Sequence, residues 1–276
     1  MYSSILCAFT FLSSILMPID PNRTELVDLF LFAHQDDEFG VFHMIDESRR
    51  QGRRVVCAYL TRGVNGLALQ RNRESLRVLA KQGVSMQDVM FAGDHLRIDD
   101  AKLHLSLDAA ATWISEWITS YPEINRIYVT AWEGGHHDHD ILHALTACIT
   151  HRLGLLGKVR QFALYNHDRC PGPLFRVLSP LKSNGPVDFY RVKLSKRLTY
   201  LGLCLQYPSQ RKTWIGLFPF VLLHYLLDGR QALQRISMER LDQRPHSGTL
   251  YYEQRGFFDW ERMTSALQQW RGLARQ

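Results

Sequence analysis

The sequence contains no closely spaced pair of cysteines. Its five cysteines stand at positions 7, 57, 148, 170 and 204 and form no C-x-x-C motif. Cys57 and Cys148 lie within apolar runs, where small buried thiols are common. The pattern gives no sign of a disulfide framework and is typical of a reduced, cytoplasmic protein.

No run of basic residues is dense enough for a nucleic-acid-binding arm, although the net charge is +6 at pH 7 and the pI is about 9.1. Lys and Arg occur as scattered pairs, such as Arg49-Arg50 and Arg211-Lys212. We therefore expect no nucleic-acid partner. With 46% apolar and 22% charged residues, the composition is that of an ordered globular chain.

No apolar run is long enough to predict a transmembrane helix. Ile5–Met17 lacks a basic region, since the first arginine is Arg23, and it has no cleavage motif, so we do not expect a signal peptide. Trp214–Leu227 contains Pro219 and is shorter than the roughly 17 to 25 residues that a spanning helix needs. Core packing is the favoured interpretation of Trp214–Leu227. Peripheral membrane contact, or anchoring by the first run, stays an open alternative.

Short apolar segments alternate with helical patterns in the first part of the chain. Buried strands are expected at Val27–Phe32, Arg54–Leu60, Val89–Phe91, Arg126–Ala131 and Gln161–Tyr165. Helices are expected at Glu38–Gln51, Ala68–Gln82, Ser106–Ser120 and Asp140–Leu153. The alternation predicts an α/β, Rossmann-like fold with a mostly parallel sheet and helices on both faces.

The alternation ends near residue 167, where proline-rich loops begin with "RCPGP" and "SPLKSNGP". We interpret residues 1–276 as a single domain. In this interpretation residues 1–166 form the α/β core, and residues 167–276 form an irregular C-terminal extension that helps to shape a cleft.

Two clusters of ionisable residues follow the first and fourth predicted strands. The first is "AHQDDEFG" (33–40), and the second is "WEGGHHDHD" (132–140). In a sheet of order 3-2-1-4-5, strands 1 and 4 are neighbours at the topological switch point, where ligands bind beyond the carboxyl ends of the strands. The clusters should therefore meet in one crevice. A divalent cation there would offset the repulsion among adjacent carboxylates, and histidine with carboxylate ligands suits Zn²⁺, with other divalent cations open.

These motifs resemble those of the PIG-L/LmbE-like family of zinc-dependent N-acetylglucosaminyl deacetylases, whose hallmarks are A-H-P-D-D-E and H-P-D-H. The matching segments here are Ala33–Glu38 and His136–His139, with the family prolines replaced by Gln35 and His137. The resemblance implies three zinc ligands, which are His34, Asp37 and His139. It also implies three catalytic residues: Asp36 as the general base, and His136, oriented by Asp138, as the group that stabilises or protonates the tetrahedral intermediate.

Weaker matches leave alternatives open. Arg71, in the R-x-x-E spacing with Glu74, either contacts substrate or forms an i, i+3 surface pair with Glu74. A further match is the segment Tyr207–Gln210, which otherwise supplies only a helix cap. His137 could replace His139 as a ligand, although the H-x-D-H alignment favours His139.

The implied reaction is zinc-dependent removal of an acetyl group from an N-acetylated amino sugar of the GlcNAc type, with release of acetate. Aromatic residues and arginines beyond residue 182 favour a sugar on a phosphate-bearing or glycan carrier. Two other functions stay open: a non-catalytic glycan- or metal-binding protein, and a metal-dependent phosphoester hydrolase. The hydrolase would need two metals about 3.5–4 Å apart and more ligands than two loops offer. The oligomeric state and the identity of the sugar are not predicted.

Overall fold

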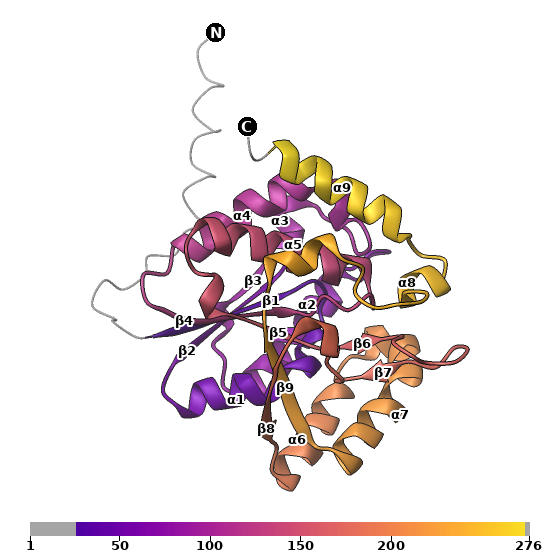
Figure 1. The fold of residues 1–276 in the computed structure, drawn as a ribbon. Coiled ribbons are helices and arrows are strands. Elements are labelled where there is room, and N and C mark those ends of the chain that lie inside the picture. The colour runs from indigo at the N-terminus through magenta and orange to yellow at the C-terminus, as the bar shows by residue number, and fades with distance from the viewer. Residues whose placement is uncertain (1–25, 274–276) are drawn as a thin grey trace, which may run out of the picture.

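A seven-stranded sheet forms the centre of the computed structural model, which describes residues 26–273 (Figure 1). The strand order is β3-β2-β1-β4-β5-β9-β8. The bounds are β1 Val27–Phe32, β2 Arg54–Tyr59, β3 Val89–Phe91, β4 Ile124–Thr130, β5 Val159–Phe162, β8 Val187–Arg191 and β9 Arg230–Arg235. The first five strands pair in parallel, whereas β9 is antiparallel to both β5 and β8. The segments β6 (Tyr165–Asn166) and β7 (Arg176–Val177) form a separate antiparallel pair.

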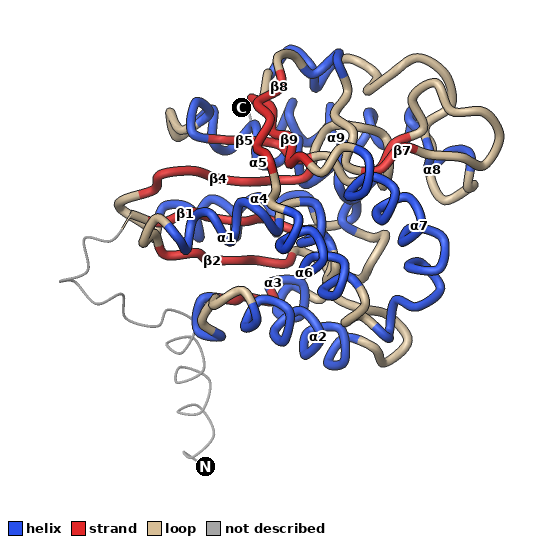
Figure 2. The backbone as a smooth tube through the Cα atoms, turned by 90° about the horizontal axis from the view of Figure 1, so that it is seen from below, coloured by secondary structure: helices blue, strands red, loops and turns tan. Residues whose placement is uncertain are grey.

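Helices cover both faces of the sheet (Figures 1 and 2). Residues of α4, α5 and α9 belong to the hydrophobic core on one face, and residues of α1, α2, α6 and α7 belong to the core on the other. The long helices are α1 Phe42–Arg50, α2 Ala68–Lys81, α4 Leu107–Thr119, α5 His137–Arg152, α6 Leu194–Cys204, α7 Arg211–Leu227 and α9 Trp260–Leu273. The short helices are α3 Ala92–Leu96 and α8 Tyr251–Gln254.

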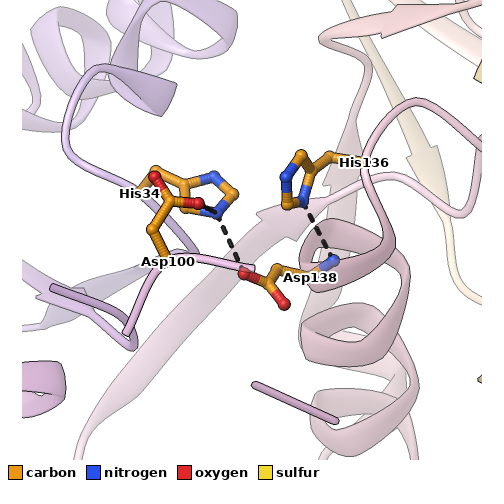
Figure 3. Close-up of side chains that lie close together, drawn as sticks. All are labelled: His34, Asp100, His136 and Asp138. Carbon is orange, nitrogen blue, oxygen red and sulfur yellow. Dashed lines mark hydrogen bonds and ion pairs between the residues drawn. The ribbon is translucent and has the colours of Figure 1, made fainter. Parts of the chain in front are cut away.

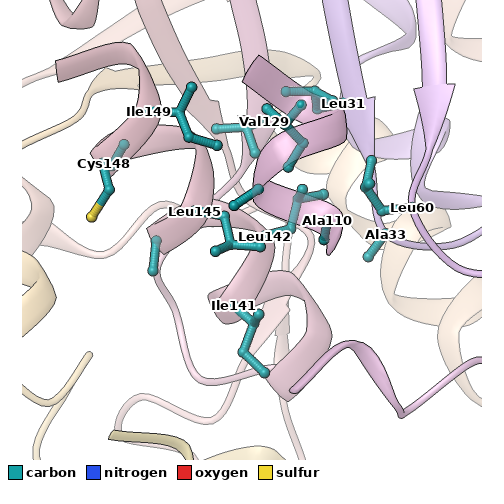
Figure 4. Close-up of a cluster of buried hydrophobic side chains, with 14 of the residues drawn as sticks. Leu31, Ala33, Leu60, Ala110, Val129, Ile141, Leu142, Leu145, Cys148 and Ile149 are labelled. Carbon is teal, nitrogen blue, oxygen red and sulfur yellow. The ribbon is translucent and has the colours of Figure 1, made fainter. Parts of the chain in front are cut away.

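Strand β1 is buried along its whole length because its alternating side chains enter the two cores. Leu29 and Leu31 pack with α4 and α5 in the first core, part of which is drawn in Figure 4. Phe30 and Phe32 pack with α1 and α6 in the second. A strand covered on both faces has no polar surface to present, which explains the continuous apolar run Leu29–Phe32 after Asp28. The two cores hold the carboxyl end of β1, from which the first motif projects.

The predicted α/β fold is confirmed. The bounds of β1 and β3 agree with the expected ones, whereas β5 begins two residues earlier than predicted. Helix α5 starts at His137 and not at Asp140, because the His136 side chain caps it by accepting a hydrogen bond from the Asp138 backbone N–H. Within the extension, β8 and β9 add two strands to the sheet that the sequence pattern did not predict.

The two apolar runs have different outcomes. Ile5–Met17 lies outside the described residues, so its packing or anchoring stays untested. Trp214–Leu227 falls within α7, which buries Trp214, Leu217, Val221 and Tyr225 against the second core. Among residues 26–273, no helix combines the length and the apolar character needed to cross a bilayer.

Candidate active site and metal centre

The two motif segments lie side by side because they leave neighbouring parallel strands. Leu31 of β1 is paired with Val129 of β4, so both strands end at the same edge of the sheet. After β1 the chain turns into a 3-10 helix at Asp37–Gly40, and after β4 a short loop leads into the amino end of α5. Residues about a hundred positions apart in the sequence are thereby brought into contact.

Three predicted ligands converge through their side-chain donor atoms. His34 Nδ1 lies 3.0 Å from His139 Nε2, which lies 3.1 Å from Asp37 Oδ1. His34 Nδ1 and Asp37 Oδ2 are 3.7 Å apart. Four ligands at about 2.0–2.2 Å around a tetrahedral Zn²⁺ would stand roughly 3.3–3.5 Å from one another. The separations seen here are of that size, and all three residues are buried.

The electrostatics of this cluster also fit a cation. Burial opposes a charge on His34, yet contacts with Asp100 and Asp138 raise the pKa of His34 well above its usual range. The carboxylates around His34 therefore favour positive charge at this position. A divalent cation binding to Nδ1 would displace a proton from the ring. Two imidazole nitrogens and one carboxylate oxygen form a donor set suited to Zn²⁺.

Asp138 holds the His34 ring with Nδ1 directed toward His139 and Asp37. Its Oδ2 lies 3.1 Å from His34 Nε2 (Figure 3). Its carboxylate also accepts hydrogen bonds from the backbone N–H groups of Ala101 and Leu103. Burial works against ionisation, but the hydrogen bond from His34 and nearby positive charge lower the pKa of Asp138 to about 2. A carboxylate on the far nitrogen of a ligating imidazole fixes its tautomer and leaves the other lone pair for the metal.

This arrangement differs from the expectation that Asp138 orients His136. Asp138 contacts the His136 ring through its backbone and not through its carboxylate. Its backbone N–H donates a hydrogen bond of 3.1 Å to His136 Nδ1, whereas its carboxylate is directed at His34 (Figure 3). His136 lines the pocket and packs edge-on against His34, with ring centroids 4.5 Å apart. Burial and the neighbouring His34 hold the pKa of His136 well below its usual range, which favours the neutral imidazole in the metal-free chain.

His137 is turned away from the convergent donor atoms. Its ring stacks on Phe258 at 4.2 Å with an interplanar angle of 11°, and its Nε2 lies 3.1 Å from the Ala101 carbonyl oxygen. His137 is absent from both groups of residues that could share an ion among the described residues. The geometry therefore favours His139 over His137 as the ligand.

The three adjacent acids of the first motif have three different environments. Asp37 faces the two histidines, Asp36 lines the pocket, and Glu38 is fully buried beneath the turn. Glu38 accepts hydrogen bonds from the Asp36 backbone N–H at 2.9 Å and from the Tyr59 hydroxyl. These separate contacts explain how the chain accommodates three adjacent carboxylates.

Asp36 adopts a strained backbone conformation, with φ of 113°. Non-glycine residues seldom occupy this region, and such strain gathers at functional sites. Burial and the adjacent Asp37 raise the pKa of Asp36 well above its usual range, while Arg71, whose Nη2 is 3.8 Å from Oδ1, opposes the shift. The strained turn separates the Asp36 carboxylate from that of Asp37 and presents it to the pocket.

Arg71 is buried at the floor of the pocket. Its guanidinium bonds to Asp100 at 2.7 Å and to the Gln35 carbonyl oxygen at 3.1 Å. The alternative of a surface pair with Glu74 is wrong, because Glu74 is fully buried and accepts hydrogen bonds from the backbone N–H and hydroxyl of Ser209. That contact ties α2 to the segment before α7.

Asp100 is a site residue that the sequence motifs missed. Its Oδ1 lies 3.2 Å from His34 Nε2, and its other oxygen accepts from Arg71. It lies in the loop between α3 and the turn at Leu103–Leu105, so pattern analysis offered only the acid pair Asp99-Asp100 as a signal.

The pocket above these residues has a volume of about 380 Å³, within the roughly 300–1,000 Å³ of small-molecule sites. Its floor carries Asp36, Asp37 and Asp100. Its walls include residues of the C-terminal extension, namely Phe175, Lys212, Gly216, Tyr251, Arg255 and Phe257. Acids at the floor and exposed cations at the rim give the pocket a charge gradient.

Gly135 allows the loop before His136 to approach β6 closely. A Cβ atom at this position would lie 2.1 Å from the Tyr165 carbonyl oxygen. We expect Gly135→Ala to lower the free energy of unfolding by about 1–3 kcal/mol, since backbone must move to relieve the overlap. Urea denaturation would measure the loss. Gly157→Ala is the control, because its Cβ would meet nothing within 4 Å; equal stability of the two variants would contradict the prediction.

A family model matches the part of the chain that carries both motifs. Residues 29–149 match the model of the PIG-L family, described as GlcNAc-PI de-N-acetylase. No curated protein matches the chain. The predicted resemblance to PIG-L/LmbE-like proteins is thereby confirmed, since the match covers both motifs.

Solved structures share the fold. A deacetylase of the teicoplanin biosynthesis pathway has 16% identity and a TM-score of 0.60, covering 76% of this chain and 98% of its own. A zinc-inhibited form of teicoplanin deacetylase has 15% identity and a TM-score of 0.52, covering 67% and 84%. N,N'-diacetylchitobiose deacetylase from Pyrococcus horikoshii has 12% identity and a TM-score of 0.59, covering 82% and 90%.

Proposed function

We propose that the chain, whose residues 29–149 match the PIG-L family model, is a zinc-dependent hydrolase that removes the acetyl group from an N-acetylated amino sugar. The observation that carries this proposal is the convergence of His34 Nδ1, His139 Nε2 and the Asp37 carboxylate beside a second carboxylate, Asp36, in one pocket. The fold neighbours include a deacetylase of the teicoplanin biosynthesis pathway and an N,N'-diacetylchitobiose deacetylase, which supports the same reaction class.

His34, Asp37 and His139 would hold the zinc ion, and Asp138 would support it through His34. When bound by three protein ligands, zinc lowers the pKa of water and polarises a carbonyl group. A fold neighbour is described in a zinc-inhibited form, so we expect activity to be highest near one equivalent of metal. Other divalent cations with the same ligand preference could replace zinc.

The chain's own residues account for the proton transfers. Asp36 accepts a proton from the attacking water as its oxygen bonds to the acetamide carbon. As the carbon–nitrogen bond breaks, Asp36 returns that proton to the leaving nitrogen, which gives acetate and a free amine. His136 borders the pocket and its Nδ1 accepts a hydrogen bond from the Asp138 N–H, so its Nε2–H would donate a hydrogen bond to the developing oxyanion and keep its proton. Arg71 and Asp100 form the adjoining polar floor, where a sugar hydroxyl would bind.

Two observations argue against a two-metal phosphoester hydrolase. A second group of donors, His34, Asp100, His136 and Asp138, lies beside the first, but it shares His34 through the other ring nitrogen. Asp100 is also paired with Arg71, whose positive charge opposes a second cation. We therefore expect one metal per chain. A non-catalytic role is disfavoured because the base position, Asp36, is filled and faces the pocket.

The proposal is tested by acetate release from a panel of acetamido sugars, with the purified chain loaded with one equivalent of zinc. We expect turnover of at least one GlcNAc-type substrate and none by the metal-free chain. Turnover of phosphoesters but of no acetamide would replace the proposal with the hydrolase alternative. Metal binding without turnover of any substrate class would favour the non-catalytic one.

The rim of the pocket favours a substrate with an anionic carrier. Lys212 and Arg255 are exposed at this rim, next to Tyr251 and Phe257, whose rings could stack on a sugar. We expect a GlcNAc-type sugar on a phosphate-bearing or glycan carrier to have a kcat/KM at least tenfold above free GlcNAc, or about 1.4 kcal/mol of added transition-state binding.

Steady-state kinetics on phosphate-bearing and free substrates would measure this preference. Lys212→Ala with Arg255→Ala should reduce it, and Arg77→Ala, which removes an exposed cation outside the pocket lining, should not. Equal kcat/KM values on the two substrates would show that the rim does not recognise a carrier.

A further inference from the structure

Helix α7 is apolar on nearly all sides, yet it lies at the surface of the molecule (Figure 2). Its inner side chains enter the second core, but Ile215, Leu223 and Leu226 are exposed by 68%, 52% and 63%. With the exposed Pro219 these positions recur at i, i+4, i+8 and i+11, which places them on one face of the helix. We call Ile215, Pro219, Leu223 and Leu226 the α7 stripe.

Positive charge predominates around the α7 stripe, although Lys196 pairs with Asp46 and the exposed Asp228 directly after α7 pairs with Arg230. From Val192 to Leu227, across α6 and α7, there is no Asp or Glu, but there are five cations: Lys193, Lys196, Arg197, Arg211 and Lys212. Neighbouring α6 also exposes leucines, with Leu194 at 67%, Leu198 at 63% and Leu205 at 61%. An apolar helix face beside basic residues is the pattern of helices that lie in the interface of an anionic bilayer.

The position of the α7 stripe further restricts its partner. Ile215 is adjacent in sequence to Gly216, which lines the pocket, and Lys212 and Thr213 of the same helix also line it. A protein seated on the stripe would stand at the mouth of the pocket and hinder entry. A bilayer surface could instead present a membrane-borne substrate to that mouth, an advantage that rests on the proposed deacetylase function.

We propose that the α7 stripe is a docking surface for an anionic lipid bilayer. The apolar side chains would enter the boundary between headgroups and acyl chains, and the basic residues of the Val192–Leu227 segment would lie near anionic headgroups. Binding would be peripheral, because no described helix is suited to span the bilayer.

Vesicle sedimentation with the full chain tests the proposal without any substrate. We expect at least tenfold stronger partitioning into vesicles of phosphatidylcholine mixed with phosphatidylglycerol than into phosphatidylcholine alone, with the difference reduced by high salt. The double variant Leu223→Glu with Leu226→Glu should lower partitioning into the mixed vesicles at least tenfold. Leu105→Glu is the matched control, since Leu105 is 66% exposed but belongs to a segment that packs with α5 and α9 on the opposite face of the sheet.

Circular dichroism would establish that each variant is folded, and Leu223→Ser with Leu226→Ser would replace the glutamate pair if that pair unfolds. Absence of partitioning into mixed vesicles, or unchanged partitioning of a folded double variant, would overturn the proposal. So would a dimer in solution that the double variant dissociates, because the stripe would then be covered by a second copy. Deacetylation of a water-soluble substrate is assayed separately, so failure of membrane docking and failure of the proposed function give different results.

Discussion

Asp36→Asn should retain the bound metal and lose about 10²- to 10⁴-fold in turnover, the usual contribution of a general base. The amide is nearly isosteric with the carboxylate but cannot accept the proton of the attacking water. Asparagine also tolerates positive φ well, so the backbone turn held by Glu38 should persist at the φ of 113° seen for Asp36. Steady-state kinetics together with elemental analysis of the purified variant would measure both effects.

Asp99→Asn is a suitable control for Asp36→Asn. Its side chain is 45% exposed and pairs with Arg62, outside the pocket, so the substitution should leave turnover within about twofold of the unaltered chain. If Asp36→Asn proved nearly as active as this control, another group would have to be the base. If it lost the metal as well, Asp36 would belong to the ligand set.

The order of the first five strands was predictable because strands alternate with helices in this part of the chain, which indicates a doubly wound parallel sheet. The bounds of β1 follow from its unbroken run of buried residues, whereas β4 begins two residues earlier than predicted because its amino-terminal end includes the half-buried Asn125 and Arg126. Strands β8 and β9 were missed for a physical reason. Most of β8 is exposed, and β9, though largely buried, carries polar residues such as Gln231 and Gln234 that bond to backbone groups. Their sequences therefore lack an apolar signal.

The motifs predicted the position of the site better than its supporting contacts. His34, Asp37 and His139 occupy the expected strand and helix ends, because adjacent parallel strands place them there. The contact of Asp138 with His34, over a hundred residues away, depends on how α5 packs beside β1. Asp100 enters from an irregular loop after β3. Neither contact has a sequence signature, since both arise from tertiary packing of segments distant in the chain.

Substitutions of His139, Asp138 and His137 provide a graded test of the proposed metal centre. The three side chains differ in how closely they approach the convergent donor atoms. His139 Nε2 lies 3.0 Å from His34 Nδ1 within the cluster. Asp138 acts one contact further out, on His34 Nε2 at 3.1 Å. His137 is stacked on Phe258 and directs no nitrogen at the cluster. We therefore expect the loss of metal affinity to be largest for substitution of His139, smaller for Asp138 and absent for His137.

We expect His139→Ala to abolish stoichiometric metal binding and, with it, activity. Asp138→Asn should weaken binding by about 10- to 100-fold, the usual cost of losing a group that orients a ligand. His137→Ala should bind one metal per chain, although loss of its packing on Phe258 will reduce stability. Competition with a chelating dye would rank the affinities, and elemental analysis would give the stoichiometry. Loss of the metal in His137→Ala but not in His139→Ala would assign the second histidine ligand to His137, and full binding by both would place the metal elsewhere.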